Sequence, residues 1–333
     1  MKLERKLVFI VGEPRSGTTW LMWLLARHPS VAASFHSSLF HALKPLRQWW
    51  TKEVPYGKTV HTHTGNAQDP VSEIKLNGLL SFEKFIELVR PLASHVFDQI
   101  ASCGSDVRVV VEDTPENLEF LQWILQIFPD AYVLHIIRDP RSVFSSQRAA
   151  AYSWVPPRIG RIATNPVLLA RSWRAYLELG GKVRKKTSRY REIHYEKLLS
   201  NGAQELAAIF AWLELPADDA LVQSAVEAGA IDSLKKKDLP KGFVRKGSAE
   251  GWRGELSKRD IRAIEYIAGD QMERLGYELV MPRGRKPFQV RRHEFTTEAL
   301  RKTNTFLRRM AVVRVLRRVP ILKRMLEAMV ETQ

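Results

Sequence analysis

The sequence predicts an α/β fold of three layers, with a central, mostly parallel sheet flanked by helices. Two observations carry this prediction. Short apolar runs alternate along the chain with longer segments of helical periodicity, and most connections between them are short. Such alternation is typical of a parallel sheet that is buried on both faces. The chain has 333 residues, 45% of them hydrophobic, so we expect one large domain at residues 1–281 and a basic helical extension at residues 282–333.

The expected elements follow in chain order. Three short apolar runs are expected as strands, at residues 7–11, 108–111 and 131–137, and a more polar strand is expected at residues 189–195. Seven segments with apolar residues at helical spacing are expected as helices: residues 18–27, 81–90, 115–128, 166–185, 204–213, 217–228 and 258–275. Residues 30–77 are rich in His, Trp, Pro and Gly and show no clear period, so we expect an irregular functional loop or lid there.

Positive charge is concentrated near the C-terminus. The net charge is +16, and residues 283–333 alone hold fourteen Lys and Arg against four Asp and Glu. A basic segment attracts anionic partners such as lipid headgroups, acidic polymers or nucleic acid, of which nucleic acid is the least favoured here. Residues 298–329 have helical apolar spacing, which Pro320 interrupts. This pattern fits a helix on an anionic membrane, and equally a helix packed on its own domain or on a partner subunit.

Cysteine content and hydropathy indicate the compartment. The single cysteine, Cys103, excludes an intramolecular disulfide framework and suits a reducing compartment. No apolar run approaches the length of a membrane span, and residues 7–11 are too short for the apolar part of a signal peptide. We therefore expect a cytoplasmic protein, and peripheral contact with a membrane stays open.

The first strand runs directly into a loop that is suited to binding an anion. Residues 12–19, GEPRSGTT, connect this strand to the first helix. Amide groups at a helix start carry the positive end of the helix dipole and favour a bound phosphate or sulfate. Arg15 adds a permanent charge, and three hydroxyl side chains add donors: Ser16, Thr18 and Thr19. The loop differs from the nucleotide triphosphate pattern G-x-x-x-x-G-K-[ST], because Thr18 stands where that pattern has Lys.

A second polar segment follows the strand at residues 131–137. Arg138 comes directly after this strand, Asp139 is suited to cap the next helix, and Pro140 is suited to its first position. Ser146 lies eight residues after Arg138, on the second turn of that helix, where it can lean back toward the strand end. By itself the segment fits an Asp-capped helix with exposed arginines. Two such segments on two strand ends favour a shared anion site.

The two segments resemble the nucleotide-binding segments of the sulfotransferases that use 3′-phosphoadenosine-5′-phosphosulfate (PAPS). Residues 14–20, PRSGTTW, match the 5′-phosphosulfate loop of that family, and Arg138 and Ser146 match the pair that holds the 3′-phosphate. The resemblance covers about residues 6–280 and implies a P-loop-like sulfotransferase fold. It also implies that a sulfuryl group moves from PAPS to an acceptor hydroxyl or amine, with no metal required.

The same resemblance assigns further residues to the cofactor. Trp20 matches an aromatic residue that stacks on adenine, and Tyr195 matches a tyrosine near the adenine. Residues 244–256, VRKGSAEGWRGEL, resemble the loop R-K-G-x-x-G-x-W-K that closes the nucleotide site, although here three residues separate the glycines. The residues expected to bind the cofactor are Arg15, Ser16, Gly17, Thr18, Thr19, Trp20, Arg138, Ser146, Tyr195, Arg245, Lys246 and Gly247.

The catalytic base is less well defined. Relatives use a His, or a Glu shortly after the first helix, and that position falls near His36 here, with His41 next. Many relatives read E-K-T-P where residues 112–115 read E-D-T-P, so Asp113 replaces a lysine that helps to stabilise the transferring group. If the difference is catalytic, Asp113 or Glu112 is the base, or another cation replaces the lysine, or the activity is impaired. If it is structural, the acidic pair caps the next helix. The catalytic candidates are Arg15, His36 and Asp113.

The motifs do not specify the acceptor. Three aromatic residues of the 30–77 segment, Trp49, Trp50 and Tyr56, favour stacking on a ring, so a glycan or a lipid-linked sugar is our first expectation. Two other functions stay open. A P-loop kinase of small molecules would need ATP and Mg²⁺. An inactive sulfotransferase-like protein would bind a membrane or another anion without PAPS.

Overall fold

The central sheet consists of five parallel strands in the order β2-β5-β1-β6-β7. The computed structural model describes residues 5–51, 59–62, 72–75, 81–153, 164–230, 247–282 and 284–296, with the backbone alone at 48–51, 59–62 and 72–75. The strands are β1 (Lys6–Val11), β2 (Val31–Ser34), β5 (Val109–Glu112), β6 (Tyr132–Ile137) and β7 (Tyr190–His194). A separate antiparallel pair is formed by β3 (Thr59–Thr62) and β4 (Ser72–Lys75).

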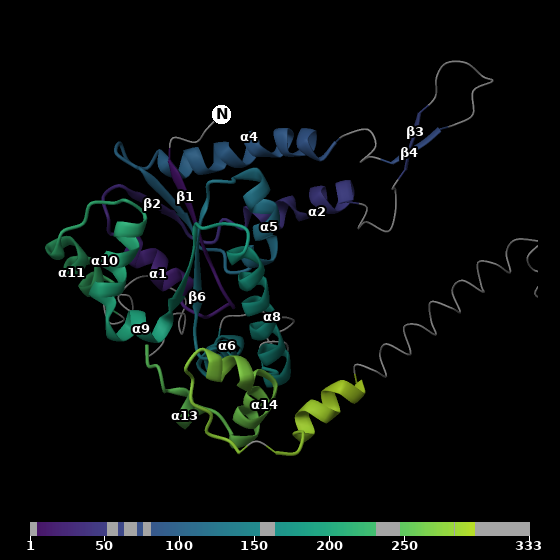
Figure 1. The fold of residues 1–333 in the computed structure, drawn as a ribbon, viewed down its shortest axis with the longest axis vertical. Coiled ribbons are helices and arrows are strands. Elements are labelled where there is room, and N and C mark those ends of the chain that lie inside the picture. Colours follow the sequence, from purple (N-terminus) through teal and green to yellow (C-terminus); the bar gives the residue numbers. More distant parts are fainter. Residues whose placement is uncertain are drawn as a thin grey trace, which may run out of the picture.

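Helices cover both faces of the sheet, which confirms the predicted three-layer fold (Figure 1). One face is covered by α2 (Leu39–Thr51), α4 (Phe82–Ala101), α5 (Asn117–Ile127) and α8 (Pro166–Arg184). The other face is covered by α1 (Thr18–Leu25), α9 (Tyr195–Ser200), α10 (Gly202–Trp212) and α11 (Asp219–Ala228). A third apolar cluster joins α8 to α6 (Pro140–Ala151), α13 (Trp252–Glu255) and α14 (Lys258–Arg274).

β1 lies at the centre of the sheet because it is apolar on both faces. Its successive side chains alternate, so that Phe9 belongs to the core under α4 and α5, and Ile10 to the core under α1. The register places Phe9 opposite Glu112 of β5 and Val11 opposite His135 of β6. The parallel strands β1, β5 and β6 therefore end at one edge of the sheet, and the loops that follow them lie together there.

The prediction of an irregular segment at residues 30–77 was wrong for much of its length. This segment holds β2, an edge strand of the central sheet, as well as α2 and the β3–β4 pair. β2 is short and contains two alanines, so its pairing with β5, and not a strong strand propensity, stabilises it. α2 contains Pro45, which interrupts its pattern, while Phe40 and Leu43 are buried in the core. Of the predicted acceptor-binding aromatics, Trp49, Trp50 and Tyr56, no side chain is described.

α4 continues well beyond its predicted end at residue 90, with Pro91 inside it. A proline usually ends a helix because it lacks the N–H donor and crowds the preceding turn. Here Val89, Ala93 and Phe97 are buried along one face on both sides of Pro91. This burial offsets the lost hydrogen bond.

The C-terminal extension is described only in its first part. Residues 288–296 form a helix, whereas the basic helix predicted at 298–329 lies outside the described residues. Within the described part of the chain, no helix has the combination of length and apolar character that crossing a bilayer requires.

Candidate functional site

The loop after β1 closes on the start of α1 with the geometry of an anion site. Gly17 precedes α1 with a φ of 108°, a left-handed conformation that glycine adopts without strain. The Ser16 amide donates to the Glu13 carbonyl oxygen at 2.9 Å, and Thr18, the first residue of α1, is buried. The Ser16 hydroxyl is also buried and has no hydrogen-bond partner within the described residues. Because a buried hydroxyl without a partner is costly, this group is suited to a ligand oxygen.

Gly17 leaves no room for a side chain. A Cβ atom at this position would lie 2.7 Å from Cδ2 of Tyr195. We therefore expect Gly17→Ala to lower the free energy of unfolding by about 1–3 kcal/mol, from this contact and the positive φ. Urea unfolding measures the change. Gly181→Ala is the matched control, because a Cβ atom at that position in α8 meets nothing within 4 Å. Equal losses in the two variants would contradict the packing under the loop.

The structure brings together the two polar segments that the sequence singled out. Nε of Arg15 donates to Oγ of Ser146 at 3.3 Å, although the two residues lie on different strand–helix units. Nη1 of Arg138 donates to the Arg15 carbonyl oxygen, also at 3.3 Å. Arg15 itself has a φ of 77°, a left-handed conformation that is rare outside glycine and clusters at functional sites. Two arginines from the loops that follow β1 and β6, and a serine of α6, thus form one cluster.

Arg138 is positioned from three sides. Its guanidinium group lies 4.0 Å from the centre of the Tyr195 ring, and Nη2 donates to the Ser248 carbonyl oxygen at 3.4 Å. Its own carbonyl oxygen accepts from Nε1 of Trp173 at 2.9 Å. The Nε atom of Arg138 is buried and has no hydrogen-bond partner among the described residues. The side chain is therefore fixed, with a donor left over for an anion.

α6 begins as the sequence predicts, with Pro140 as its first residue and Asp139 as its cap. Asp139 also pairs with the buried Arg141 at 2.7 Å, and Arg141 pairs with Glu265 of α14 at 2.6 Å. The Arg141 guanidinium group lies 3.9 Å from the centre of the Trp252 ring. This network ties the start of α6 to α13 and α14, and so it fixes the backbone that carries Arg138.

Trp20 and Tyr195, both assigned to the adenine, are neighbours. Their ring centroids are 5.1 Å apart at an angle of 59°. Nε1 of Trp20 donates to the Gly229 carbonyl oxygen at 3.0 Å, and the ring is half-buried. Tyr195 is buried beneath Gly17 and Arg138. Its ring therefore supports the loop, and Trp20 is the more accessible of the two aromatic side chains.

The described part of the 244–256 loop, which starts at Gly247, packs on α6. Gly247 has a φ of 62°, and the carbonyl oxygen of Ala249 accepts from Oγ of Ser142 at 2.8 Å. With the contact from Arg138 to Ser248, this places the described part of the loop beside the 3′-phosphate segment. Arg245 and Lys246 lie outside the described residues, so their role stays a prediction.

Glu112 organises the backbone at the end of β5. Its buried carboxylate accepts from the amide and hydroxyl of Ser37, from the amide and hydroxyl of Thr114, and from the side-chain amide of Asn117. Burial raises the pKa of Glu112, and the hydrogen bonds oppose the rise. Because both carboxylate oxygens already accept hydrogen bonds, Glu112 fits the expectation that it caps the start of the next helix better than the expectation that it is the catalytic base.

His36 and Asp113 face each other beside the anion loop. Oδ1 of Asp113 accepts from the His36 amide at 2.8 Å, and Oδ2 lies 3.6 Å from Nε2 of the His36 ring. The hydroxyl of Thr19 lies 3.5 Å from the same ring nitrogen. Asp113 is fully buried, whereas the His36 side chain is 36% exposed. Burial raises the pKa of Asp113, and the neighbouring His36 limits the rise.

His36 also has an unusual backbone conformation, of a kind that clusters at functional sites. Its φ of 43° is left-handed, and its ring stacks on the exposed Phe35 with the centroids 4.4 Å apart. His41, the second candidate base, instead packs edge-on against Phe120 on α5, with a centroid distance of 5.2 Å. The structure therefore places His36, and not His41, in contact with Asp113.

Glu13 is a residue of the loop to which the sequence analysis gave no role. Its buried carboxylate accepts from the hydroxyl of Ser172 at 2.7 Å and from the side-chain amide of Gln147 at 3.1 Å. Burial raises its pKa to about 7. The sequence did contain a sign that Glu13 is unusual, namely its position inside a loop suited to binding an anion. A charged carboxylate there would repel the anion unless the group is buried and protonated.

Glu13 makes the stability of the protein depend on pH. Its pKa is higher in the folded protein than in the unfolded chain, so the folded state binds the extra proton and stability falls as pH rises from about 4.5 to about 7. We expect Glu13→Gln, which keeps the size and can keep both hydrogen bonds, to raise the free energy of unfolding at pH 8 by about 3 kcal/mol more than at pH 5. Urea unfolding at the two pH values measures this difference. Glu87→Gln, at an exposed site on α4, should show no such difference.

The fold and the site define a class of protein: an α/β protein with a parallel central sheet and a candidate anion site at the carboxyl ends of β1 and β6. The model of the sulfotransferase family matches residues 8–219. This match covers more than half of the chain, and the chain belongs to the sulfotransferase family. It is a sulfotransferase enzyme. Within the described residues, His, Cys, Asp and Glu side chains form no group of three that could hold a metal ion.

Several known proteins are similar to this chain in sequence or structure. Nodulation protein NoeE of Sinorhizobium fredii is 24% identical over 319 residues, which cover 89% of this chain and 72% of the relative. Protein-tyrosine sulfotransferase 1 of Danio rerio is 20% identical over 285 residues, with 83% and 73% covered. The sulfotransferase domain of the Synechococcus PCC 7002 olefin synthase aligns with a TM-score of 0.52 and 18% identity, over 85% of this chain and 98% of that domain. The last comparison shows a shared fold.

Proposed function

We propose that this sulfotransferase takes its sulfuryl group from PAPS and transfers it to a hydroxyl group of an acceptor. The cluster of Arg15, Arg138 and Ser146 carries the proposal, since it joins the loop expected to hold the 5′-phosphosulfate to the segment expected to hold the 3′-phosphate. Two buried polar atoms without partners in the described residues, Oγ of Ser16 and Nε of Arg138, fit a ligand with several anionic oxygens.

The residues present fit the parts of such a nucleotide. The loop amides, Arg15 and the hydroxyls of Ser16 and Thr18 are suited to the 5′-phosphosulfate. Arg138 and Ser146 are suited to the 3′-phosphate, and Trp20 to the adenine. When bound, PAPS supplies an activated sulfuryl group, whose bond to the bridging phosphate oxygen breaks as sulfur bonds to the acceptor oxygen. Arg15 is the charged side chain of the loop and stabilises negative charge near the reacting group.

His36 is our candidate for the general base. It takes the proton of the acceptor hydroxyl, and Asp113 stabilises the imidazolium that results. Nε2 of His36 faces Asp113 and Thr19, so Nδ1 is the nitrogen left to accept the proton. Asp113 is then a positioning residue, which explains how an acid can occupy the position where many relatives have a lysine.

A sugar hydroxyl is the acceptor that we favour. Phe35, 51% exposed beside His36, offers an aromatic surface on which a sugar ring can pack. A tyrosine side chain is the second candidate, since several similar proteins are named as protein-tyrosine sulfotransferases. Transfer of ³⁵S from labelled PAPS to oligosaccharides, to glycolipids and to tyrosine peptides distinguishes the two.

The one cysteine, Cys103, is unpaired and exposed, in keeping with a reaction in the cytoplasm.

Isothermal titration of the wild-type protein with adenosine 3′,5′-bisphosphate, without Mg²⁺, tests the donor. We expect micromolar or tighter binding, and much weaker binding of adenosine 5′-monophosphate, which lacks the 3′-phosphate. A folded protein that ignores the bisphosphate but binds ATP with Mg²⁺ would contradict the proposal and support the kinase alternative. A folded protein that binds neither nucleotide, but binds another anion with a steep dependence on salt, would support the inactive alternative.

A further inference from the structure

The helix at residues 288–296 presents an exposed face of aromatic and arginine side chains. Phe288 is 60% exposed and Phe295 76% exposed. Arg291 and Arg292, which lie between them in sequence, are exposed as well. Spacings of three, four and seven residues place all four on one face of a helix. Exposed phenylalanines gathered with arginines in this way indicate a surface that contacts a partner.

The opposite face holds this helix on the domain. Val290 is buried against Val167 of α8. Glu294, the one acid among residues 284–296, pairs with Lys286 at 2.8 Å and with Arg171 at 3.6 Å. These contacts fix which side of the helix faces the domain. They also balance the negative charge of Glu294, so that no acid within the described residues pairs with Arg291 or Arg292 on the outward face.

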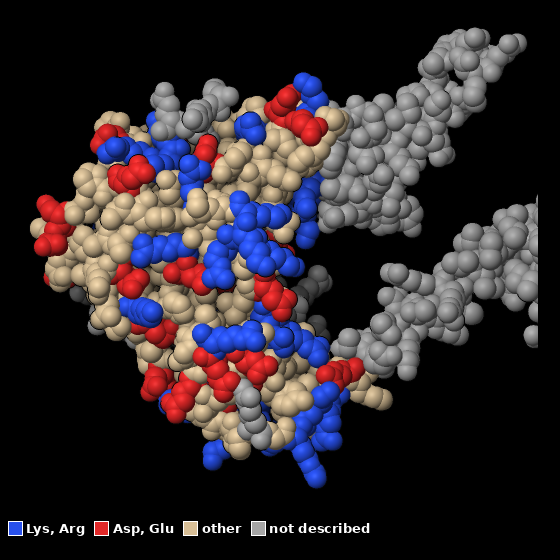
Figure 2. Space-filling model, in the orientation of Figure 1, with Lys and Arg blue, Asp and Glu red and all other residues tan. Residues whose placement is uncertain are grey.

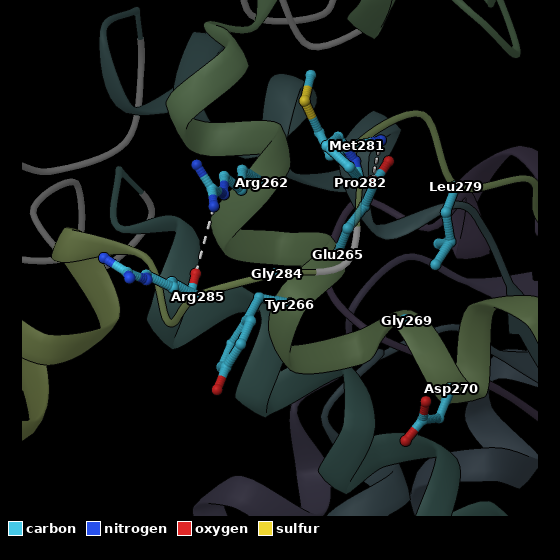
Figure 3. Close-up of a pocket in the computed structure, with 10 residues that line it drawn as sticks. All are labelled: Arg262, Glu265, Tyr266, Gly269, Asp270, Leu279, Met281, Pro282, Gly284 and Arg285. Carbon is cyan, nitrogen blue, oxygen red and sulfur yellow. Dashed lines mark hydrogen bonds between the residues drawn. The ribbon is translucent and has the colours of Figure 1, made fainter.

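A groove of about 190 Å³ lies between α14 and the segment at residues 279–282 and 284–285, and its lining includes two arginines and two acids (Figure 3). Arg262 and Arg285 lie at one end of the groove, where Nη2 of Arg262 donates to the Arg285 carbonyl oxygen at 3.3 Å. Asp270 lies at the opposite end. In Figure 2 blue Lys and Arg side chains gather at the lower right of the molecule, over α14 and the segment after it.

We propose that this face, Phe288, Arg291, Arg292 and Phe295, binds the surface of an anionic lipid bilayer. The phenylalanine rings enter the boundary between headgroups and acyl chains, and the arginines contact lipid phosphates, with Arg262 and Arg285 beside them. The inference is independent of the sulfuryl donor.

Two features favour a bilayer over nucleic acid or a protein. Residues 297–333 hold nine Lys and Arg against three Glu, so the charge of the whole segment complements anionic headgroups. Between these cations the sequence carries mostly Leu, Val, Ile and Met, as in residues 310–316, MAVVRVL. Alternation of cations with such apolar residues is typical of segments that lie on an anionic membrane.

Sedimentation of the full-length protein with vesicles tests the proposal. We expect binding to phosphatidylcholine vesicles that contain phosphatidylglycerol, and little binding to phosphatidylcholine alone. Combined Phe288→Ser and Phe295→Ser should weaken the partition at least about tenfold. Combined Arg291→Gln and Arg292→Gln should also weaken it about tenfold. The matched control combines Leu88→Ser and Leu92→Ser on α4, which are 67% and 52% exposed and should leave binding unchanged.

Thermal unfolding and titration with adenosine 3′,5′-bisphosphate show whether each variant is folded. A wild-type protein that ignores anionic vesicles would overturn the proposal, and so would a double-Phe variant that binds them as the wild type does. Two further outcomes would assign the face to another partner and overturn it too. One is preferential binding of single-stranded nucleic acid, and the other is a dimer that the double-Phe substitution dissociates.

Discussion

Arg138→Ala is expected to weaken the binding of adenosine 3′,5′-bisphosphate by a factor of at least about 100. The substitution removes the cation suited to the 3′-phosphate, including the Nε donor that has no partner within the described residues. It also removes the contacts to the Arg15 carbonyl oxygen and to the Tyr195 ring, and both lie under or within the anion loop. Binding of the 5′ part of the ligand should therefore weaken as well.

Isothermal titration without Mg²⁺ measures this effect. Arg189→Ala is the matched control. Arg189 lies at the amino end of β7, whereas the candidate site lies at the carboxyl ends of β1 and β6. It pairs with Asp130 at 2.6 Å on the surface, so its loss should change affinity less than twofold. If Arg138→Ala binds the bisphosphate nearly as tightly as the wild type, the 3′-phosphate is held elsewhere. Circular dichroism and thermal unfolding would exclude a folding defect as the cause of a large loss.

The second large effect is expected at His36. His36→Ala should lower kcat for ³⁵S transfer to the accepted substrate by about 100- to 10,000-fold, because the base that takes the acceptor proton is lost. Affinity for adenosine 3′,5′-bisphosphate should change far less, since the imidazole faces Asp113, Thr19 and Phe35, whereas the 3′-phosphate is expected at Arg138 and Ser146. This division between kcat and affinity separates a catalytic role from a structural one.

Two other variants sharpen the test of His36. His41→Ala, on a ring that packs against Phe120, should keep nearly the whole activity. Asp113→Asn should lower kcat less than His36→Ala, since it removes the charge that stabilises the imidazolium but keeps the acceptor for the His36 amide. Added imidazole should restore part of the activity of His36→Ala. Full activity of His36→Ala would instead leave Asp113 as the base to test.

The elements that the sequence predicted well are those with local signals. Residues 7–11 and 131–137 are continuous apolar runs, and both are central strands that are buried on both faces. Asp139 and Pro140 mark the start of α6 because a cap and a first helical position depend on adjacent residues alone. The role of Gly17 can also be predicted from the sequence, since a tight strand–loop–helix turn needs a residue that tolerates positive φ.

The elements that were missed depend on distant partners. β2 is a strand only because β5 supplies its hydrogen bonds. Pro91 is tolerated within α4 because Val89 and Phe97 are buried on either side of it. The burial that raises the pKa of Glu13 comes from surroundings that include Gln147 and Ser172, far away in the sequence. No window of local sequence contains these contacts.

By itself, the sequence of this protein determined the fold class, the loop at residues 12–19 and the segment that begins at Arg138. Periodicity, caps and short motifs are properties of neighbouring residues, so they can be read along the chain. Only the tertiary structure decided that Arg15 meets Ser146, that Glu112 arranges backbone while Asp113 faces His36, and that Phe288 and Phe295 point outward. These are outcomes of packing between elements far apart in the chain, where burial and hydrogen bonding decide which side chain can reach which partner.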